Sequence, residues 1–176
     1  MQHILLSTLG STISITPLIN SITTLSSSVY NLIGHLKITK NTHYTELMKM
    51  LAKTDIEATI VLLQTIILDI SALPPSVYFT NKFIPIALSN VKESITLIDQ
   101  ELHAIKEKIH YNNTIYILAN MRSHDLLPNI DTIENNITVL DRRCEYLFKC
   151  LDLCKHFAHT ETPSMEGRDA VLSDTI

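Results

Sequence analysis

The first 36 residues contain no Asp, Glu, Lys or Arg, and Lys37 is the first charged side chain of the chain. Ser and Thr interrupt this stretch throughout, and Gly10 and Pro17 divide it. A membrane-spanning helix needs roughly 20 mainly apolar residues in succession. We therefore predict no membrane span here. No Lys/Arg cluster precedes the apolar part and no small-residue cleavage site stands out, so we also expect no signal peptide.

Tryptophan is absent, and 176 residues contain only three Gly and six Pro. So little turn chemistry disfavours a sandwich or barrel of many strands. An excess of basic residues is missing too, because 18 acidic side chains face 14 basic ones. The resulting net charge of -4 and a pI near 6.0 argue against a nucleic-acid binder of the usual basic kind. A hydrophobic fraction of 45% excludes global disorder.

Four segments show the period of an amphipathic helix, and the third is the clearest. Its aliphatic side chains alternate spacings of three and four, with Lys, Glu and Asp between them. They are Leu88, Val91, Ile95, Ile98, Leu102, Ile105 and Ile109. A strand has a period of two and would place Ile95 and Ile98 on opposite faces. The pattern therefore predicts a helix with a narrow apolar stripe.

The fourth segment repeats this pattern. Its stripe consists of Ile130, Ile133, Ile137, Leu140, Cys144, Leu147, Leu151 and Cys154. We expect Asn129, after Pro128, to be the N-cap, with Asp131 and Glu134 in the first turn, where negative charge suits the helix dipole. Beyond Leu147 the stripe widens, and this predicts a more deeply buried end. The side chains that widen it are Phe148, Cys150, Leu153 and Phe157.

The second segment starts near Tyr44 and contains a boundary signal. The run from Thr54 to Glu57, Thr-Asp-Ile-Glu, is typical of a capping box. It predicts either a short helix followed by a longer one, or one helix with a local irregularity. The longer part has a stripe that should make this helix central, and Leu73-Pro74-Pro75 should end it. The stripe comprises Ile56, Ile60, Leu63, Ile67 and Ile70, widened by Val61, Leu62, Ile66 and Leu68.

The first segment is less regular. Thr16-Pro17 is typical of an N-cap followed by proline at the first helical position. The spacing of three and four then continues through Leu18, Ile22, Leu25, Val29, Leu32 and Leu36. Upstream, residues 13–16 alternate like a strand, whereas Ile4 to Leu9 look helical. We expect a kinked or broken N-terminal helix, since packing can override the low helix propensity of β-branched residues.

The connectors are predicted at residues 37–43, 73–84 and 112–128. Four stripes joined by such loops predict an all-α fold, a four-helix bundle. Isolated helices of this length are marginal in water, so the stripes must pack against one another. We assign residues 1–158 to the helical bundle domain. Residues 159–176 lack a periodic stripe, and we expect a flexible, disordered C-terminal tail there.

Cysteine and histidine gather near the end of the fourth segment. Cys150, Cys154, His156 and His159 form a C-x3-C-x-H-x2-H string. Cysteines four apart share a helical face and could bind a soft metal, but the spacing matches no familiar zinc motif. Buried thiols are the favoured interpretation. Cys144 is the third cysteine of the chain and lies close to the other two. Such clustering favours reduced thiols in a cytoplasmic, reducing compartment.

No nucleophile motif, phosphate-binding glycine loop or H-E-x-x-H motif is present. Asp55, Glu57 and Asp69 could be carboxylate ligands of a metal-dependent enzyme, but the Glu-x-x-His pairs of helical metal sites are missing. His103 falls outside the stripe, so a solvated histidine is expected. The prediction is therefore no enzyme and no catalytic, cofactor-binding or metal-ligating residue, with no cofactor and no small-molecule substrate.

Arginine does not form a basic patch either. Arg122, Arg142 and Arg143 have acidic neighbours in the sequence, Asp125, Asp141 and Glu145. Local ion pairs on a solvated face account for such a pattern. We predict no nucleic-acid partner.

The uncharged N-terminal region allows three interpretations. It is a buried helix, or its polar face packs against another subunit or a partner, or residues 1–36 enter a membrane. The outward face offers Ser21, Thr24, Ser28 and Asn31 where a soluble helix normally carries charge. Such a face loses little when it is covered, which favours contact with a protein partner or a second copy.

Short matches suggest a family. They include Asp55-Ile56-Glu57 at the start of an apolar helix, Ile109-His110-Tyr111-Asn112 at a helix end, and Leu140-Asp141-Arg142-Arg143. Together with a composition rich in Ile, Asn and Thr, these resemble uncharacterised small helical proteins of large double-stranded DNA viruses. The expected connector Trp-Arg pair is absent. The resemblance implies no activity.

The architecture is also similar to the four-helix domains of cell-death executioners: the mixed-lineage-kinase-like, HeLo and RPW8-type bundles. From all this we expect a non-enzymatic interaction or structural protein, viral in origin, that packs helical faces against itself or a host or virion partner. The alternative is a membrane-active bundle that uses its N-terminal segment. A virion or membrane association is compatible with either hypothesis.

Overall fold

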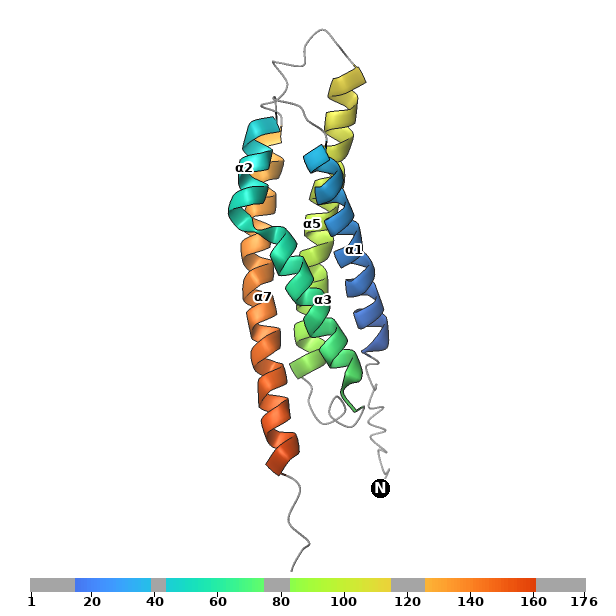
Figure 1. Ribbon diagram of the computed structural model, residues 1–176, viewed down its shortest axis with the longest axis vertical. Coiled ribbons are helices and arrows are strands. Elements are labelled where there is room, and N and C mark those ends of the chain that lie inside the picture. The colour runs from blue at the N-terminus through green and yellow to red at the C-terminus, as the bar shows by residue number, and fades with distance from the viewer. Residues whose placement is uncertain (1–14, 39–43, 75–82, 115–125, 161–176) are drawn as a thin grey trace, which may run out of the picture.

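The computed structural model of the chain describes residues 15–38, 44–74, 83–114 and 126–160 (Figure 1). All regular elements in these ranges are helices, which confirms the all-α class. They are α1 (Thr16–Ile38), α2 (Thr45–Thr54), α3 (Ile56–Ala72), α5 (Phe83–Thr114) and α7 (Leu127–Thr160). None of them is both long and apolar enough to cross a membrane.

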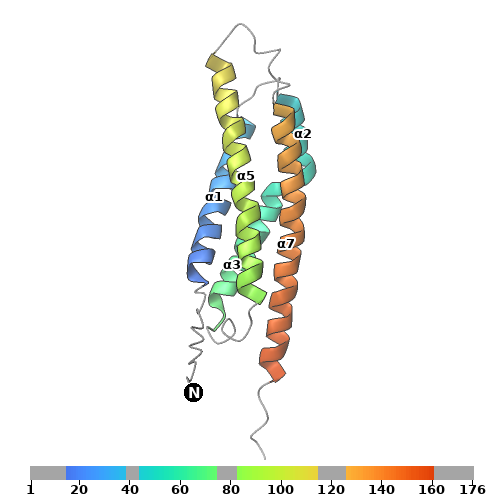
Figure 2. The same cartoon turned by 180° about the vertical axis from the view of Figure 1, so that it is seen from behind.

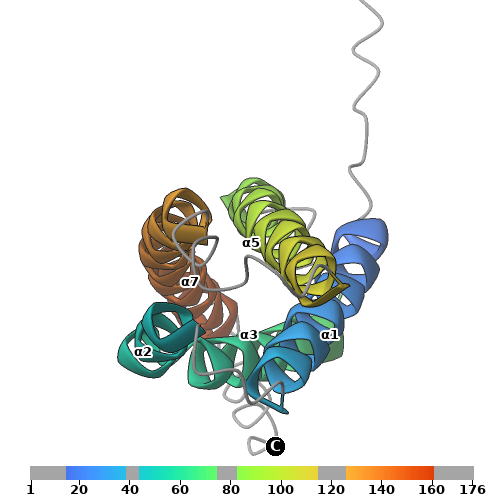
Figure 3. The same ribbon diagram turned by 90° about the horizontal axis from the view of Figure 1, so that it is seen from above.

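The helices lie side by side along one long axis. In Figures 1 and 2, α1 and α5 run in one direction, whereas α2, α3 and α7 run in the other. The most extensive contacts join α5 to α7 and to α1, and α3 packs against α1 and α7. Helix α5 is therefore the most extensively packed helix. The expectation that the second segment would be central is wrong, because α3 covers one side of the core (Figure 3).

One apolar core lies between the helices, and the predicted stripes form it. In α5, all seven stripe residues from Leu88 to Ile109 are buried. The eight stripe residues of α7, from Ile130 to Cys154, are buried as well. The inner stripe of α3 consists of Ile56, Ile60, Leu63, Ile67 and Ile70, none more than 3% exposed. Burial of one such side chain contributes about 1.5–3 kcal/mol, so these stripes hold the helices together.

Helix α1 begins at Thr16 with Pro17 in its first turn, close to the predicted start. The backbone N–H of Ile19 donates to the carbonyl oxygen of Ile15 at 2.9 Å, which closes this turn. Proline suits the position because a backbone N–H in the first turn has no intrahelical partner, so its absence costs no hydrogen bond. From Thr16 the helix continues to Ile38. The predicted kink or break lies in residues 1–14, outside the described residues.

The second segment forms two helices with a break at Asp55. Asp55 has φ 45° and ψ 37°, in the left-handed region, where Asp and Asn are tolerated better than most residues. The short-then-long alternative is therefore confirmed. The capping box is wrong: the Thr54 hydroxyl donates back to the Met50 carbonyl oxygen at 2.9 Å, and Glu57 pairs with Lys37 instead.

The predicted N-cap of the fourth segment is also wrong. Helix α7 begins at Leu127, so Asn129 lies inside its first turn. The Asn129 amide joins two helices: its Oδ1 accepts from Lys108 Nζ at 2.8 Å and its Nδ2 donates to Glu101 Oε2 at 2.7 Å. A side chain engaged by α5 in this way is not available to cap its own helix.

The Leu73-Pro74 stop is confirmed. Helix α3 ends at Ala72, and Leu73 adopts an extended conformation while its N–H donates to the Ile70 carbonyl oxygen at 3.1 Å. The residue before a proline is pushed out of the helical region, which explains this end. Helix α7 ends at Thr160, two residues past the predicted domain boundary at 158. The tail and the central parts of the connectors lie outside the described residues.

Candidate interaction surface

The charged side chains of α5 and α7 hold these two helices together. Arg143 on α7 donates from one guanidinium nitrogen to the Asn90 carbonyl oxygen at 2.6 Å, Ser94 Oγ at 2.9 Å and Glu93 Oε2 at 3.0 Å. The prediction of local pairing with Asp141 and Glu145 is therefore wrong for Arg143, since its partners are on the neighbouring helix. Arg142 is exposed, and Arg122 lies outside the described residues.

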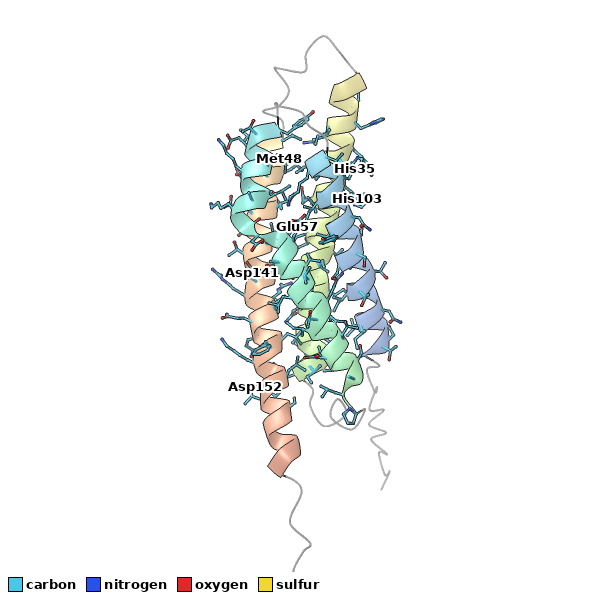
Figure 4. The ribbon with its side chains drawn as sticks, viewed as in Figure 1. His35, Met48, Glu57, His103, Asp141 and Asp152 are labelled. Atoms are coloured by element: carbon cyan, nitrogen blue, oxygen red, sulfur yellow. The ribbon has the colours of Figure 1, made fainter. Side chains whose placement is uncertain are left out.

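Three smaller helix contacts, α2 with α7, α3 with α7 and α1 with α3, each have a polar link as well. Lys53 on α2 donates to Glu134 on α7 at 2.5 Å, and Thr59 on α3 donates to Asp141 on α7 at 3.0 Å. Hydrogen bonding to Glu134, and secondarily its charge, raises the pKa of Lys53. Lys37 donates to Glu57 at 2.5 Å and joins α1 to α3 (Figure 4). These polar contacts link neighbouring helices.

The outward face of α1 has hydroxyls and amides in place of charges. Its exposed side chains from Thr16 to Asn31 are Thr16, Pro17, Asn20, Thr23, Thr24, Ser27, Tyr30 and Asn31. Three of the hydroxyls donate to carbonyl oxygens four residues earlier: Thr23 at 3.0 Å, Thr24 at 2.9 Å and Ser27 at 3.0 Å. Covering this face would therefore leave these three donors bonded, whereas the amides of Asn20 and Asn31 would need hydrogen-bond partners across the contact.

The predicted polar face of α1 is found only in part. Thr24 and Asn31 are exposed, whereas Ser21 and Ser28 are half-buried at the edges of the helix. Ser26, which the sequence analysis did not single out, is fully buried, and its hydroxyl has no hydrogen-bond partner among the described residues. The buried face of α1 is otherwise apolar, with Ile22, Val29 and Ile33 all at 0% exposure.

The outward face of α3 is apolar, contrary to expectation. Val61, Leu62 and Leu68 were predicted to widen the buried stripe, but they are 50%, 57% and 70% exposed. Only Ile66 of that group is buried. The inner stripe already fills the contact with α1 and α7, so these three side chains point away from the core. A helix that is apolar on both faces is normally buried on both.

The exposed residues of α3 form a second stripe, which we call the outer stripe: Ala58, Val61, Thr65, Leu68 and Ala72. Its spacings are three, four, three and four, the same heptad rhythm as the inner stripe. Leu62 lies beside it. Sequence reasoning could have found this stripe, because both rhythms are present in the same 17 residues. We call the outer stripe, Leu62 and the exposed face of α1 from Thr16 to Asn31 together the uncharged surface.

The wider stripe predicted a more deeply buried end of α7, and this prediction is wrong. Cys150 is 7% exposed, but Phe148 and Leu153 are 59% and 56% exposed, and Tyr146 is 63% exposed. Phe148 lies on the opposite side of the helix from Tyr146 and Leu153, as a turn of about 100° per residue requires. These side chains therefore do not gather into one surface. The side chain of Phe157 lies outside the described residues.

The three cysteines are buried and form no disulfide. Burial, and secondarily the charge of Asp141, raises the pKa of Cys144 to about 12. Burial, and secondarily Cys154, raises the pKa of Cys150. A thiolate is the form that binds metals and attacks electrophiles, so the environment of Cys144 and Cys150 opposes both. The side chains of His156 and His159, the other half of the predicted string, lie outside the described residues.

The acidic candidates do not come together. Asp55 is the residue between α2 and α3, Glu57 pairs with Lys37, and Asp69 is exposed further along α3. His103 is exposed, as predicted, with Nδ1 at 3.0 Å from the Asp99 carbonyl oxygen (Figure 4). Within the described ranges, no group of three His, Cys, Asp or Glu residues could hold a metal ion.

Comparisons with protein-family models, with curated proteins and with solved structures found no significant match to this chain.

Proposed function

We propose that the protein is a non-enzymatic helical interaction protein, which acts by packing its uncharged surface against helices of another protein molecule. In this proposal the described helices are a four-helix bundle in which α2 and α3 together make the second helix. The observation that carries the proposal is the outer stripe of α3. Its large side chains, with Leu62 beside them, remain in water while their spacing is that of a helix-packing surface.

The energetics favour a covered outer stripe. Leu62 and Leu68 are each more than half exposed, and complete burial of a leucine contributes about 1.5–3 kcal/mol. The flanking face of α1 has no charge to desolvate, and the donors of Thr23, Thr24 and Ser27 are already used within the helix. A partner would therefore gain apolar burial without desolvating a charge, provided that it offers hydrogen bonds to Asn20 and Asn31.

A membrane-active function, through residues 1–36, is the second candidate. Its support is the absence of charge between Thr16 and Leu36. Against it stands the buried face of α1, because Ile22, Val29 and Ile33 belong to the core and would have to leave it before inserting. Leakage from liposomes separates the two candidates. Leakage that depends on residues 1–36 would favour membrane activity, and no lipid binding would remove it.

The setting of the proposed function follows the sequence analysis. Three buried cysteines without a disulfide support a reducing compartment such as the cytoplasm. The resemblance to small helical proteins of large DNA viruses fits a protein whose partner is a host or virion component. The proposal assigns no catalytic role to any residue.

The test combines two measurements on the full chain. Light scattering reports self-association, and affinity capture followed by mass spectrometry reports other partners. We expect at least one of them to be positive and to be lost in Leu68→Glu, which places a charge on the outer stripe. Tyr146→Glu, at a residue equally exposed on α7, is the matched control and should change neither. A strict monomer that captures no protein would contradict the proposal.

A further inference from the structure

We propose that the uncharged surface binds a second copy of this chain, with the two α3 helices antiparallel about a two-fold axis at the level of Leu63. This inference rests on the proposed function and specifies its partner. Three features of the molecule support it: the order of side-chain sizes along the outer stripe, the position of Asp69 and the area of the uncharged surface.

The outer stripe is complementary to its own reverse. In an antiparallel pair, alternate stripe positions face each other, so Ala58 lies opposite the partner's Leu68 and Val61 opposite the partner's Thr65. Each layer then combines a large side chain with a smaller one, which fills space evenly. A parallel pair would place Ala58 on the partner's Ala58 and would leave that layer underfilled.

This register keeps the two Asp69 residues apart. Asp69 flanks the outer stripe and is exposed. At a rise of 1.5 Å per residue, a two-fold axis at Leu63 separates the two Asp69 residues by about 18 Å along the helix, well beyond the screening length of roughly 8–10 Å. The other antiparallel register, with Thr65 opposite the partner's Leu68, brings them to about 7.5 Å. A parallel pair brings them to the same level.

Leu62 lies close to the proposed axis. It would be offset from the partner's Leu62 by only about 3 Å along the helix, so the two leucines would cover each other. Leu62 is 57% exposed in the single chain. Its contact would extend the outer stripe sideways at the centre of the interface, where buried side chains contribute most to binding.

The area of the uncharged surface suits a weak dimer. Helix α3 has 17 residues and the uncharged face of α1 runs from Thr16 to Asn31, so they are about 25 Å and 24 Å long. Side by side, at about 10 Å each, they present roughly 500 Å² in projection. A standard interface buries about 800 Å² per partner, and α3 alone would fall far short of it. The face of α1 is therefore needed for the interface.

Net charge also favours this surface for self-association. The chain carries a net charge of -4, so two copies repel each other wherever charged faces meet. The outer stripe and the face of α1 from Thr16 to Asn31 carry no charge, and no other described helix lies in front of α3 in Figure 1. Two copies can approach here with few like charges close together: Asp69 lies level with the partner's Glu57, but Lys37 of the same chain pairs with each Glu57.

The experiment is crosslinking of single-cysteine additions with a short bismaleimide. Leu62→Cys should give a crosslinked dimer in high yield, because the two positions lie near the axis. Leu68→Cys alone should give almost none, because its two copies would be about 15 Å apart along the helix. A mixture of Leu68→Cys and Ala58→Cys should crosslink again. The parent chain, whose own cysteines are buried, is the control.

Sedimentation of the full chain measures the affinity. We expect Leu68→Glu to raise the dimer Kd at least about 100-fold, since the change acts twice in a two-fold interface, while helicity stays at the parent value. Tyr146→Glu should leave the Kd unchanged. A monomer at every concentration, with no crosslink at Leu62→Cys, overturns this inference.

The two proposals fail separately. A monomer that captures another protein, and loses it in Leu68→Glu, overturns the dimer but supports the interaction function. Crosslinking at Leu68→Cys without crosslinking at Leu62→Cys overturns the antiparallel register. Self-association and capture that both survive Leu68→Glu overturn the role of the uncharged surface itself.

Discussion

The two helix pairs of this molecule, α1 with α3 and α5 with α7, share one core but differ in how they meet water. Helices α1 and α3 carry three charged side chains, Lys37, Glu57 and Asp69, whereas α5 and α7 carry sixteen. Arg143 and Glu101 show that part of the charge of α5 and α7 holds the two helices together. In the α1–α3 pair, hydroxyls and exposed leucines occupy the corresponding positions.

The difference shows what a hydrophobic period can and cannot decide. In α5, charged residues occupy much of the outward face, so the apolar stripe has one orientation only. In α3 the outward face is apolar too, and either stripe satisfies the helical period. The free energy of burial alone therefore does not identify the inner face of α3, whereas in α5 it does.

The largest effect tests the part that both pairs share. Ile98→Asp on α5 places an unpaired charge at a fully buried position, and we expect the loss of stability to exceed about 5 kcal/mol and to unfold the chain. Circular dichroism measures it. Leu97→Asp, at the neighbouring residue with 43% exposure, is the control and should keep its helicity. Equal melting of both variants would show that the stripe of α5 is misplaced.

The next test distinguishes the two stripes of α3. Ile67 is 3% exposed and Leu68 is 70% exposed, although they are adjacent in the sequence. We expect Ile67→Ala to lower the free energy of unfolding by about 2–5 kcal/mol, and Leu68→Ala to change it by less than about 0.5 kcal/mol in the dilute monomer. Urea denaturation measures both. Reversed effects would exchange the inner and outer stripes.

The pH dependence of stability tests the burial of Cys144 of α7 in the core. The pKa of the Cys144 thiol is raised to about 12 in the folded chain, against about 8.5 for a free cysteine. Between these values the folded state holds a proton that the unfolded state releases. We therefore expect the stability to be full below about pH 8.5 and to fall as the pH rises. Cys144→Val should flatten this fall, measured by urea titrations across the pH range.

Thiol labelling provides the kinetic side of the same prediction. In the folded chain, Cys144 should react with a disulfide reagent far more slowly than in urea, because the thiolate is rare and buried. Equal rates in both conditions would place Cys144 outside the core.

A smaller effect tests the charged contact between α5 and α7. Arg143→Met removes three hydrogen bonds to α5 and keeps the apolar stem, and we expect it to lower the stability by about 1 kcal/mol. Arg142→Met, on the exposed neighbour, is the control and should stay within about 0.5 kcal/mol. Thermal unfolding measures both. Equal effects would mean that the ties from Arg143 do not stabilise the fold.

The matching test in the α1–α3 pair has the opposite sign. The buried Ser26 hydroxyl has no partner among the described residues, so Ser26→Ala removes an unsatisfied polar atom. We expect a gain of roughly 1 kcal/mol, seen as a higher midpoint of thermal unfolding. Ser27→Ala, at the exposed and bonded neighbour, should change stability little. A loss in Ser26→Ala would mean that its hydroxyl is bonded after all.

Much of the fold could be predicted from the sequence. The helices, their inner stripes and the stop before Pro74 follow from local spacing and from the chemistry of proline, and the structure agrees. Ends and caps were harder, because Asn129 and Glu57 bond to other helices. A side chain can cap its own helix only if no other group binds it. Here Lys108 binds Asn129 and Lys37 binds Glu57, and both lysines are distant in the sequence.

The candidate surface could be predicted only in part. The absence of charge in α1 is visible in the sequence, and it indicated a contact face. The exposure of Val61 and Leu68 is not, because it depends on how α3 is rotated about its own axis. Local spacing does not determine that rotation when both faces are apolar.

The left-handed residue Asp55 connects α2 to α3 and contributes to this rotation. A helix turns about 100° per residue, so adding or removing one residue at Asp55 would swing α3 about its axis by that angle relative to α2. Two residues would turn it by about 200° and exchange its interior and exterior. The backbone conformation of one residue thus influences which of the two apolar faces of α3 is buried. A change of length at this point would expose core side chains to solvent without altering any side chain.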